Sequence, residues 1–510
     1  MNKRSSGLLL HLSSLYTPYG IGDLGPEAMK FVDFLKASGQ RFWQILPLNP
    51  TDAESDNSPY RSSSAFAFNP LLISLDRLVQ AGYLLQSEVE KLPHFPKNHV
   101  DYEKVTAFKM PLLDRAYRRF SAKQQPEDFV RFCDAQAYWL DDYALFTALK
   151  GHFKGSEWVK WPQPIRDREP DALSKLKVQL REALDKVRFF QFIFLQQYEA
   201  LRAYCHECGV ELIGDIPIYV AMDSADVWTH PHIFKLGDDK RPLKVSGVPP
   251  DYFSETGQLW GNPVYRWDVM QENDFDWWLH RIRHNLALFD IVRIDHFRGF
   301  VAFWEVPFGE KTAIKGQWTQ APARAFIRRV QQEFSELPII AEDLGLITPD
   351  VVEVMSDFHL PGMRVLQFAF SGDLATNGHV PHNLVKHSFL FTGTHDNNTT
   401  RGWWRRDATM QEKENLLRYL GRPVRGSQVH TVLMHLAMTT VANTVIIPVQ
   451  DLLGLDESHR MNRPFASAGN WDWRLDSAQL KPVLGRRLYA LSQMTGRLAG
   501  ESGTPAYDSY

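Results

Sequence analysis

Short apolar segments that each end in a polar or charged residue constrain the fold of this chain most strongly. Helical patterns lie between most of these segments, and such an alternation is typical of βαβ units and a parallel sheet. We therefore predict an α/β fold, a TIM (β/α)8 barrel. The predicted strands are 210–214, 289–294, 337–341, 363–366, 389–394 and 445–449, with an earlier strand in the apolar run at 42–47.

The length of the chain predicts large insertions in this barrel. A barrel needs about 250 residues, whereas the chain has 510. Residues from about 76 to 205 are mainly helical in pattern, and those from about 221 to 285 are loop-rich and are expected to cover the cleft. We predict a single (β/α)8 catalytic domain over residues 1–510, with mainly helical insertions and no separate C-terminal β-domain.

Charge and cysteine usage exclude several classes of partner. Lys and Arg total 57 against 60 Asp and Glu, a formal net charge of −3, so we expect neither nucleic acid nor an anionic membrane surface as a partner. No segment reaches the roughly 18 apolar residues of a transmembrane helix, and the run at 7–12 is too short for a signal peptide. The three cysteines, Cys133, Cys205 and Cys208, form no regular framework, which indicates a reducing, cytoplasmic location.

Two motifs suggest a cofactor or a metal at first sight. Residues 20–25 spell G-x-G-x-x-G, but residues 13–19 separate them from any strand, and the next strand ends without the carboxylate that binds a ribose. His230 and His232 lack a third ligand at a recognisable spacing. We therefore expect no cofactor and no metal.

Carboxylates at the ends of predicted strands indicate the chemistry. Asp295, Glu342 and Asp396 each follow such a strand, and Asp215 is a fourth candidate. In a TIM barrel the carboxyl ends of the strands converge on one opening, where several anions would repel one another unless the site uses them. Glycoside chemistry does so, because one carboxylate attacks the sugar while a protonated partner delivers a proton to the leaving oxygen.

The order of these residues favours a retaining mechanism. Arg293 precedes Asp295 by two positions, so both side chains lie on one face of the strand, where a guanidinium keeps Asp295 ionised. Glu342 ends the next predicted strand, and adjacent strands lie about 4.8 Å apart. This favours carboxyls roughly 5 Å apart, the spacing of enzymes that form a covalent glycosyl intermediate. Burial and the nearby Asp295 are expected to raise the pKa of Glu342.

The strand-end segments resemble conserved regions of the α-amylase clan. Their exact residues are most similar to those of the amylomaltase (4-alpha-glucanotransferase) family, family 77 of the glycoside hydrolases. The resemblance runs from about residue 7 to about 475. After Pro464 that family usually continues Gly-Thr, whereas this chain has Phe465-Ala466, so the sugar contacts of this loop stay open. The motifs are RIDHFRG at 293–299, AEDLG at 341–345, GTHDN at 393–397 and PPDYFSETGQLWGNP at 249–263, with shorter matches at 58–60, 64–66, 69–70, 214–217 and 461–464.

This resemblance implies a role for each site residue. Asp295 would be the nucleophile, Glu342 the general acid/base and Asp396 the stabiliser of the transition state. The donor site would be formed by Tyr60, Asp215, Arg293 and His395, and the cleft would be lined by Trp260, Gln258, His296, Ser58 and Asn462. The segment at 249–263 resembles the loop that covers the acceptor side. The family uses neither a metal nor an organic cofactor.

The expected partners are an α-1,4-glucan donor and a glucan or glucose acceptor; the sequence indicates no oligomeric state. The expected activity is 4-alpha-glucan transfer through a covalent glycosyl-aspartate, because a bound acceptor under the covering loop would exclude water. Two alternatives stay open. They are an α-glucan hydrolase on the same barrel and a non-catalytic glucan-binding protein, against which the three carboxylates argue.

Overall fold

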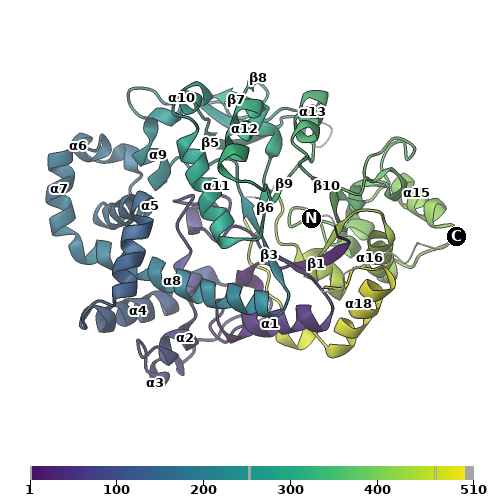
Figure 1. Cartoon of the computed structure of the whole chain (residues 1–510), viewed down its shortest axis with the longest axis horizontal. Helices are drawn as coiled ribbons and strands as arrows, with labels where there is room; N and C mark the ends of the chain where they lie inside the picture. Colours follow the sequence, from purple (N-terminus) through teal and green to yellow (C-terminus); the bar gives the residue numbers. More distant parts are fainter. Residues whose placement is uncertain (1–2, 251–253, 465, 467, 500–510) are drawn as a thin grey trace.

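Eight parallel strands form a closed barrel in the computed structural model, in the order β1-β12-β11-β10-β9-β6-β3-β2, which confirms the predicted TIM barrel (Figure 1). The structure describes residues 3–250, 254–464, 466 and 468–499. Residues 251–253 of the covering-loop motif and Phe465 therefore lie outside the described residues. The barrel strands are β1 Ser5–Leu9, β2 Phe42–Gln44, β3 Glu211–Ile216, β6 Ile291–Ile294, β9 Ile339–Ala341, β10 Gly362–Val365, β11 Ser388–Phe391 and β12 Thr444–Pro448.

Strand β1 is the barrel strand that the sequence pattern did not predict. It closes the barrel by pairing with β12 on one side and β2 on the other, and all five of its residues are buried. Gly7 lies against β2 so closely that a Cβ atom there would come within 2.4 Å of the Phe42 carbonyl oxygen. A glycine is therefore required at this position of the barrel wall.

The segment between β2 and β3 is mainly helical from Leu75 to Glu207. Its helices lie together on one side of the barrel (Figure 1, blue), with α5 packed against α8. Two buried glutamines of α8 attach it to the loop that follows β2, because Gln191 pairs with the backbone of Phe68 and Gln197 with that of Ser74. The helices are α2 Leu75–Gln80, α3 Gln86–Val89, α4 Tyr102–Ser121, α5 Glu127–His152, α6 Gln163–Arg166, α7 Pro170–Gln179 and α8 Arg181–Glu207.

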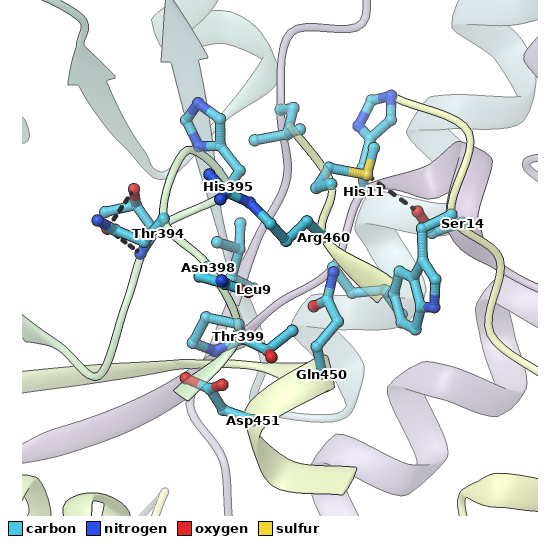
Figure 2. A pocket seen from close by; sticks show the side chains of 16 residues that line it. Leu9, His11, Ser14, Thr394, His395, Asn398, Thr399, Gln450, Asp451 and Arg460 are labelled. Atoms are coloured by element: carbon cyan, nitrogen blue, oxygen red, sulfur yellow. Dashed lines mark hydrogen bonds between the residues drawn. The ribbon is translucent and has the colours of Figure 1, made fainter. Parts of the chain in front are cut away.

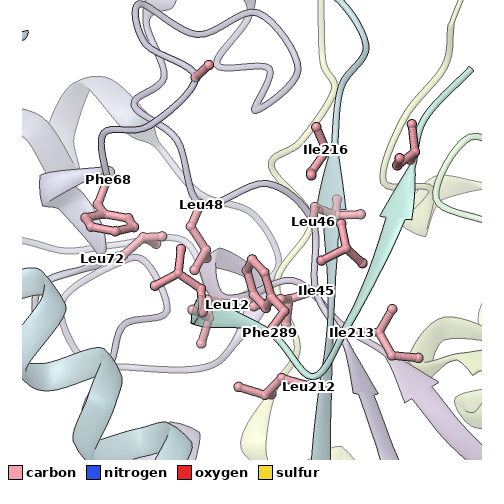
Figure 3. Packing of buried hydrophobic residues seen from close by; sticks show 14 of the residues in the cluster. Leu12, Ile45, Leu46, Leu48, Phe68, Leu72, Leu212, Ile213, Ile216 and Phe289 are labelled. Atoms are coloured by element: carbon pink, nitrogen blue, oxygen red, sulfur yellow. The ribbon is translucent and has the colours of Figure 1, made fainter. Parts of the chain in front are cut away.

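Apolar side chains join this helical segment to the barrel. Phe68 stacks on Phe194 of α8 with ring centroids 4.5 Å apart. Figure 3 shows Phe68 and Leu72 beside Leu48 in a buried cluster that also contains residues of β3, so the core continues from the barrel wall into the insertion.

A second sheet occupies part of the stretch that we expected to be loop-rich. Strands β4 Lys244–Val248 and β5 Gln258–Pro263 join β7 Ala302–Pro307 and β8 Gln317–Gln320 in the order β5-β4-β7-β8. Gly247 permits the close approach of β5, since a Cβ there would lie 2.5 Å from the Gln258 carbonyl oxygen. The helices of the same stretch are α9 Ala225–Thr229, α10 Trp267–Glu272 and α11 Asp276–Leu288.

Helices complete the barrel and the C-terminal part of the chain. Over the described residues after β12 the chain forms helices and loops without a β-domain, and α18 packs against α1 (Figure 1). No helix within the described ranges is both long and apolar enough to cross a membrane. These helices are α1 Pro26–Ala37, α12 Ala323–Glu333, α13 Pro349–Asp357, α14 Thr400–Gly402, α15 Met410–Leu420, α16 Val429–Thr439, α17 Val449–Leu453 and α18 Pro482–Met494.

Candidate active site

Two of the predicted catalytic carboxylates follow paired positions of neighbouring strands. Ile294 of β6 lies opposite Ala341 of β9, so Asp295 and Glu342, the next residues of each strand, leave the barrel side by side. The backbone N–H of His296 donates a 2.7 Å hydrogen bond to Oε2 of Glu342, which ties the two strand ends together. The structure thus brings this pair together at the carboxyl face, as the alternation of strands and helices predicted.

Arg293 connects Asp295 to Asp215. Its Nη1 donates to both carboxylate oxygens of Asp215, at 2.8 and 2.7 Å, and its Nη2 donates to Oδ1 of Asp295 at 2.8 Å. The hydroxyl of Tyr60 donates a 2.8 Å hydrogen bond to Oδ2 of Asp215. The Arg293 side chain is only 3% exposed, so these charges interact with little solvent screening.

Burial sets the protonation state of Glu342. It raises the pKa of this carboxyl to about 8; the neighbouring Asp295 adds to the rise, while Arg293 and the N–H groups of Leu344 and His296 oppose it. Glu342 is therefore mostly protonated at neutral pH. A protonated carboxyl beside an ion-paired carboxylate is the division of roles that glycosidic bond cleavage needs.

Asp396 is held as an anion. Burial by itself would raise its pKa, but His395, Asn462 and Arg293 outweigh that effect and hold the pKa well below the usual range of a carboxyl. The Asn462 amide donates to Oδ1 at 2.6 Å, and Nε2 of His395 lies 3.3 Å from Oδ2. Asp396 thus provides a permanent negative charge at the mouth of the barrel.

Aromatic rings form one wall beside these carboxylates. Tyr60 stacks on His395 with centroids 5.1 Å apart and an interplanar angle of 15°. Trp471 completes the wall at 5.4 Å from Tyr60 and 6.0 Å from His395. Ser58, also predicted for the cleft, accepts a hydrogen bond from the Tyr60 backbone N–H at 3.3 Å, so its contact within the described residues supports the wall.

Three of the predicted cleft residues, Trp260, Gln258 and His296, lie together. The ring of Trp260 meets that of His296 edge to face at 4.8 Å, and its indole N–H donates to Oε1 of Gln258 at 3.2 Å. Burial and the nearby Arg298 lower the pKa of His296 to about 3, so its imidazole is neutral at the pH where Glu342 holds its proton.

The loop that carries Asp396 is anchored by a residue outside the predicted site. Asp451, just after β12, accepts hydrogen bonds from the hydroxyls of Thr392 and Thr400 at 2.6 and 2.7 Å, and from the Thr400 backbone N–H at 2.6 Å. The loop 392–400 is therefore held at both ends. Asp451 could have been found in the sequence as a further carboxylate just after a strand. Its hydrogen bonds go to the loop that carries Asp396.

A small pocket of about 20 Å³ lies beside the same loop. Figure 2 shows His11, Asn398 and Arg460 around it, with Arg460 reaching toward His395. Nη2 of Arg460 donates to the Asp396 carbonyl oxygen at 2.9 Å. The cavity has room for about one water and none for a sugar ring, so these residues belong to the support of the site.

Trp471 and Arg460 were not predicted from the sequence. Trp471 has a φ of 62° in an irregular loop, and no periodic pattern surrounds it. The sequence feature that could have indicated it is the pair of tryptophans, Trp471 and Trp473, after the motif at 461–464.

The glycine-rich segment and the histidine pair lie apart from the carboxylates of the candidate site in their printed contacts. Asp23 of the glycine-rich segment accepts from the Gly25 N–H at 3.0 Å and lies 3.5 Å from the buried ammonium of Lys109 on α4. The His230 and His232 rings lie 6.1 Å apart, and the described residues contain no cluster of three His, Cys, Asp or Glu side chains that could hold a metal ion.

The chain is similar to known proteins over nearly its whole length. A family model described as 4-alpha-glucanotransferase matches residues 10–480. The chain is 48% identical over 504 residues to the 4-alpha-glucanotransferase of Thermus thermophilus, covering 97% of this chain and 99% of that protein. It is 43% identical over 485 residues to the chloroplastic/amyloplastic 4-alpha-glucanotransferase of Solanum tuberosum, with coverages of 94% and 83%.

Solved structures extend this likeness to three dimensions. The amylomaltase from Streptococcus agalactiae in complex with acarbose matches with a TM-score of 0.94 at 36% identity, over 97% of this chain and all (100%) of that chain. The amylomaltase from Corynebacterium glutamicum shares the fold, with a TM-score of 0.78 at 18% identity, over 97% of this chain and 75% of that chain. These matches confirm the resemblance inferred from the sequence motifs, and the chain belongs to the 4-alpha-glucanotransferase family.

Proposed function

We propose that the chain transfers a segment of an α-1,4-glucan by a retaining double displacement. In the first step Asp295 attacks the anomeric carbon, the glycosidic bond breaks, and Glu342 gives its proton to the leaving 4-oxygen. In the second step the 4-hydroxyl of a glucan or glucose acceptor attacks the same carbon, its proton passes to Glu342, and Asp295 is released. The observation that carries this proposal is the position of Glu342, a buried carboxyl with a raised pKa, beside the ion pair of Asp295 with Arg293.

The remaining charges would stabilise the transition state. The sugar ring acquires positive charge as the bond breaks, and Asp396 stays anionic in the position held by His395 and Asn462. Arg293 binds Oδ1 of Asp295, and we assign the attack to the other oxygen, Oδ2.

We assign the wall of Tyr60 and His395, with Asp215 and Arg293 behind it, to the donor sugar. A flat stacked pair beside a buried carboxylate suits an apolar sugar face and its hydroxyl rim. We assign Trp260, Gln258 and His296 to the acceptor side, with Ser58 and Asn462 as further cleft residues. By analogy with the acarbose complex of the Streptococcus agalactiae amylomaltase, we propose that acarbose also occupies this cleft.

Transfer, as opposed to hydrolysis, depends on the exclusion of water from the glycosyl-enzyme. We propose one catalytic domain in which the stretch 221–285 covers the cleft, since Trp260 and Gln258 on β5 lie beside His296. The helical segment 76–205 would hold the donor-side loop from behind through Gln191 and Gln197.

Incubation of the pure enzyme with maltotriose tests the proposed reaction. We expect glucose and longer chains to form while the total number of reducing ends stays constant. A steady rise in reducing ends would identify a hydrolase, and the absence of any product would identify a non-catalytic glucan-binding protein. Asp295→Asn should abolish turnover while maltotriose binding, measured by calorimetry, persists.

We also propose a cytoplasmic location. Cys133, Cys205 and Cys208 are all free thiols, a state that reducing compartments preserve. Cell fractionation followed by thiol labelling without reductant would test this, and oxidised cysteines in the native protein would contradict it.

A further inference from the structure

A second, larger groove lies outside the catalytic centre. Its volume is about 570 Å³, within the roughly 300–1,000 Å³ typical of ligand sites. Side chains from α5, α9, the α10–α11 turn and α12 line it, together with the loop at residues 64–66. We call it the Tyr138 groove, after the α5 residue at its wall.

The Tyr138 groove opens toward the catalytic face. In a (β/α)8 barrel each helix begins on the face where the preceding strand ends, and the groove is built around Asp276, the first residue of α11. Its other wall holds Ser64 and Phe66, a few residues along the same loop from the donor-side Tyr60. The groove and the wall that contains Tyr60 therefore share one loop of the chain.

The ring of Tyr138 is exposed and yet held in place. It is 44% exposed, while its hydroxyl lies 3.1 Å from Nδ1 of His284. The His280 ring stacks on it at 5.3 Å and the Phe66 ring meets it edge to face at 5.9 Å. A fixed aromatic surface loses little further side-chain entropy when a ligand binds, as a pre-formed binding platform requires.

The charges of the Tyr138 groove disfavour an anionic ligand. Among its lining residues, all of which are described, Arg329 is the only Arg or Lys, and it is already paired with Asp274 at 2.6 Å and Glu333 at 3.1 Å. His230 adds no charge, because burial lowers its pKa to about 4. An anion would therefore meet carboxylates without a free cation.

The carboxylates of the groove are also partly neutralised. Asp142 pairs with Arg168 at 2.6 Å, and Asp226 accepts from the Ala65 N–H at 2.8 Å. Asp276 lies 3.4 Å from His280. The oxygens of these carboxylates accept hydrogen bonds, as the hydroxyl groups of a sugar would require. Aromatic faces with hydrogen-bond acceptors fit a neutral polyhydroxylated chain.

We propose that the Tyr138 groove is a second site for α-1,4-glucan, which holds a remote part of a long chain while its reacting end lies at Asp295. This rests on the proposed function, which makes such chains the substrate. Binding at two linked sites raises the apparent affinity for long chains alone, because a short oligosaccharide cannot span both.

Substitution of Tyr138 separates the two sites. Tyr138→Leu removes the ring but keeps apolar bulk against Phe66, and Tyr138→Phe keeps the ring. The matched control is Tyr489→Leu on α18, whose ring is 40% exposed and lies outside the groove. For Tyr138→Leu we expect KM for amylose to rise about fivefold or more, with kcat and KM for maltotriose within twofold of wild type. Tyr138→Phe and Tyr489→Leu should behave as wild type.

Three outcomes would overturn the second site. The first is an unchanged KM for amylose in Tyr138→Leu, and the second is an equal rise in KM for amylose and maltotriose. The third is that the wild-type groove binds spermidine and not amylose, and that Tyr138→Leu abolishes this spermidine binding. Retardation in amylose-containing gels, with every protein also carrying Asp295→Asn, measures binding without turnover, and must weaken when Tyr138→Leu is added but not when Tyr138→Phe or Tyr489→Leu is added. Failure of wild type to convert maltotriose would contradict the proposed function instead, and gel retardation would still test the groove.

Discussion

His296 donates its backbone N–H to the carboxyl of Glu342 at 2.7 Å. Since His296 directly follows Asp295, this bond links the proposed acid/base to the strand that carries the proposed nucleophile. His296 adopts a left-handed backbone conformation, with φ of 52°, which is uncommon for a residue with a side chain. Its ring is held by Trp260 at 4.8 Å, so the acceptor-side wall and the spacing of the two carboxyls depend on the same residue.

The pH dependence of turnover should report the raised pKa of Glu342. The proposed acid must be protonated, so kcat/KM for maltotriose should fall as the pH rises through about 8, the pKa that burial gives this carboxyl. A profile that stays flat to well above this pH would contradict the assignment. Glu342→Gln should lose turnover of maltotriose but still release fluoride from an α-glucosyl fluoride, because fluoride leaves without a proton.

Removal of Arg293 should lower the stability of the fold. Arg293→Met leaves the buried carboxylate of Asp215 without its partner, which should lower the free energy of unfolding by about 3–5 kcal/mol. Urea denaturation measures this loss. The double variant Arg293→Met/Asp215→Asn is the control, because it removes the stranded charge and should recover a substantial part of the stability. Equal losses in both variants would show that charge pairing is not the cause.

The sequence was sufficient to predict the carboxyl face of the barrel. Asp295, Glu342 and Asp396 follow apolar strands, and a parallel barrel brings such strand ends to one opening. The pairing of Arg293 with Asp295 also follows from local order, since the two side chains share a strand face and bind one another as alternation predicts.

Strand β1 was missed because only its second half, Leu8 and Leu9, is apolar, while two of its buried residues, Ser5 and Ser6, are polar. Ser5 is paired with Thr444 at 3.3 Å and Ser6 with Ser492 at 3.4 Å. Both partners lie more than 400 residues away, so the local sequence does not indicate that these two hydroxyls are buried in a strand. Strand β4 was also difficult to predict, because its partner β7 follows it in the sequence only after the barrel strand β6.

Asn462 should control the acid limb of the pH profile. Its amide is one of the groups that hold the pKa of Asp396 well below the usual range. Asn462→Ala should raise that pKa and move the acid limb of kcat/KM to higher pH, with kcat lower by about 10- to 100-fold. The control is Asn383→Ala, whose side chain binds backbone carbonyls at 374, 375 and 377. An unshifted acid limb with normal kcat would contradict this role.

Gly7 should be irreplaceable, because β1 and β2 are in close contact at that point. In Gly7→Ala the added methyl would lie 2.4 Å from the Phe42 carbonyl oxygen and 2.5 Å from its Cβ, which forces the barrel strands apart at a cost of about 1–3 kcal/mol or more. Gly151→Ala is the matched control in α5, where a Cβ meets nothing within 4 Å, and it should stabilise by about 0.5–1 kcal/mol. Thermal and urea unfolding of both variants measure the difference. If Gly7→Ala proved as stable as wild type, β1 could not lie as close to β2 as the barrel requires.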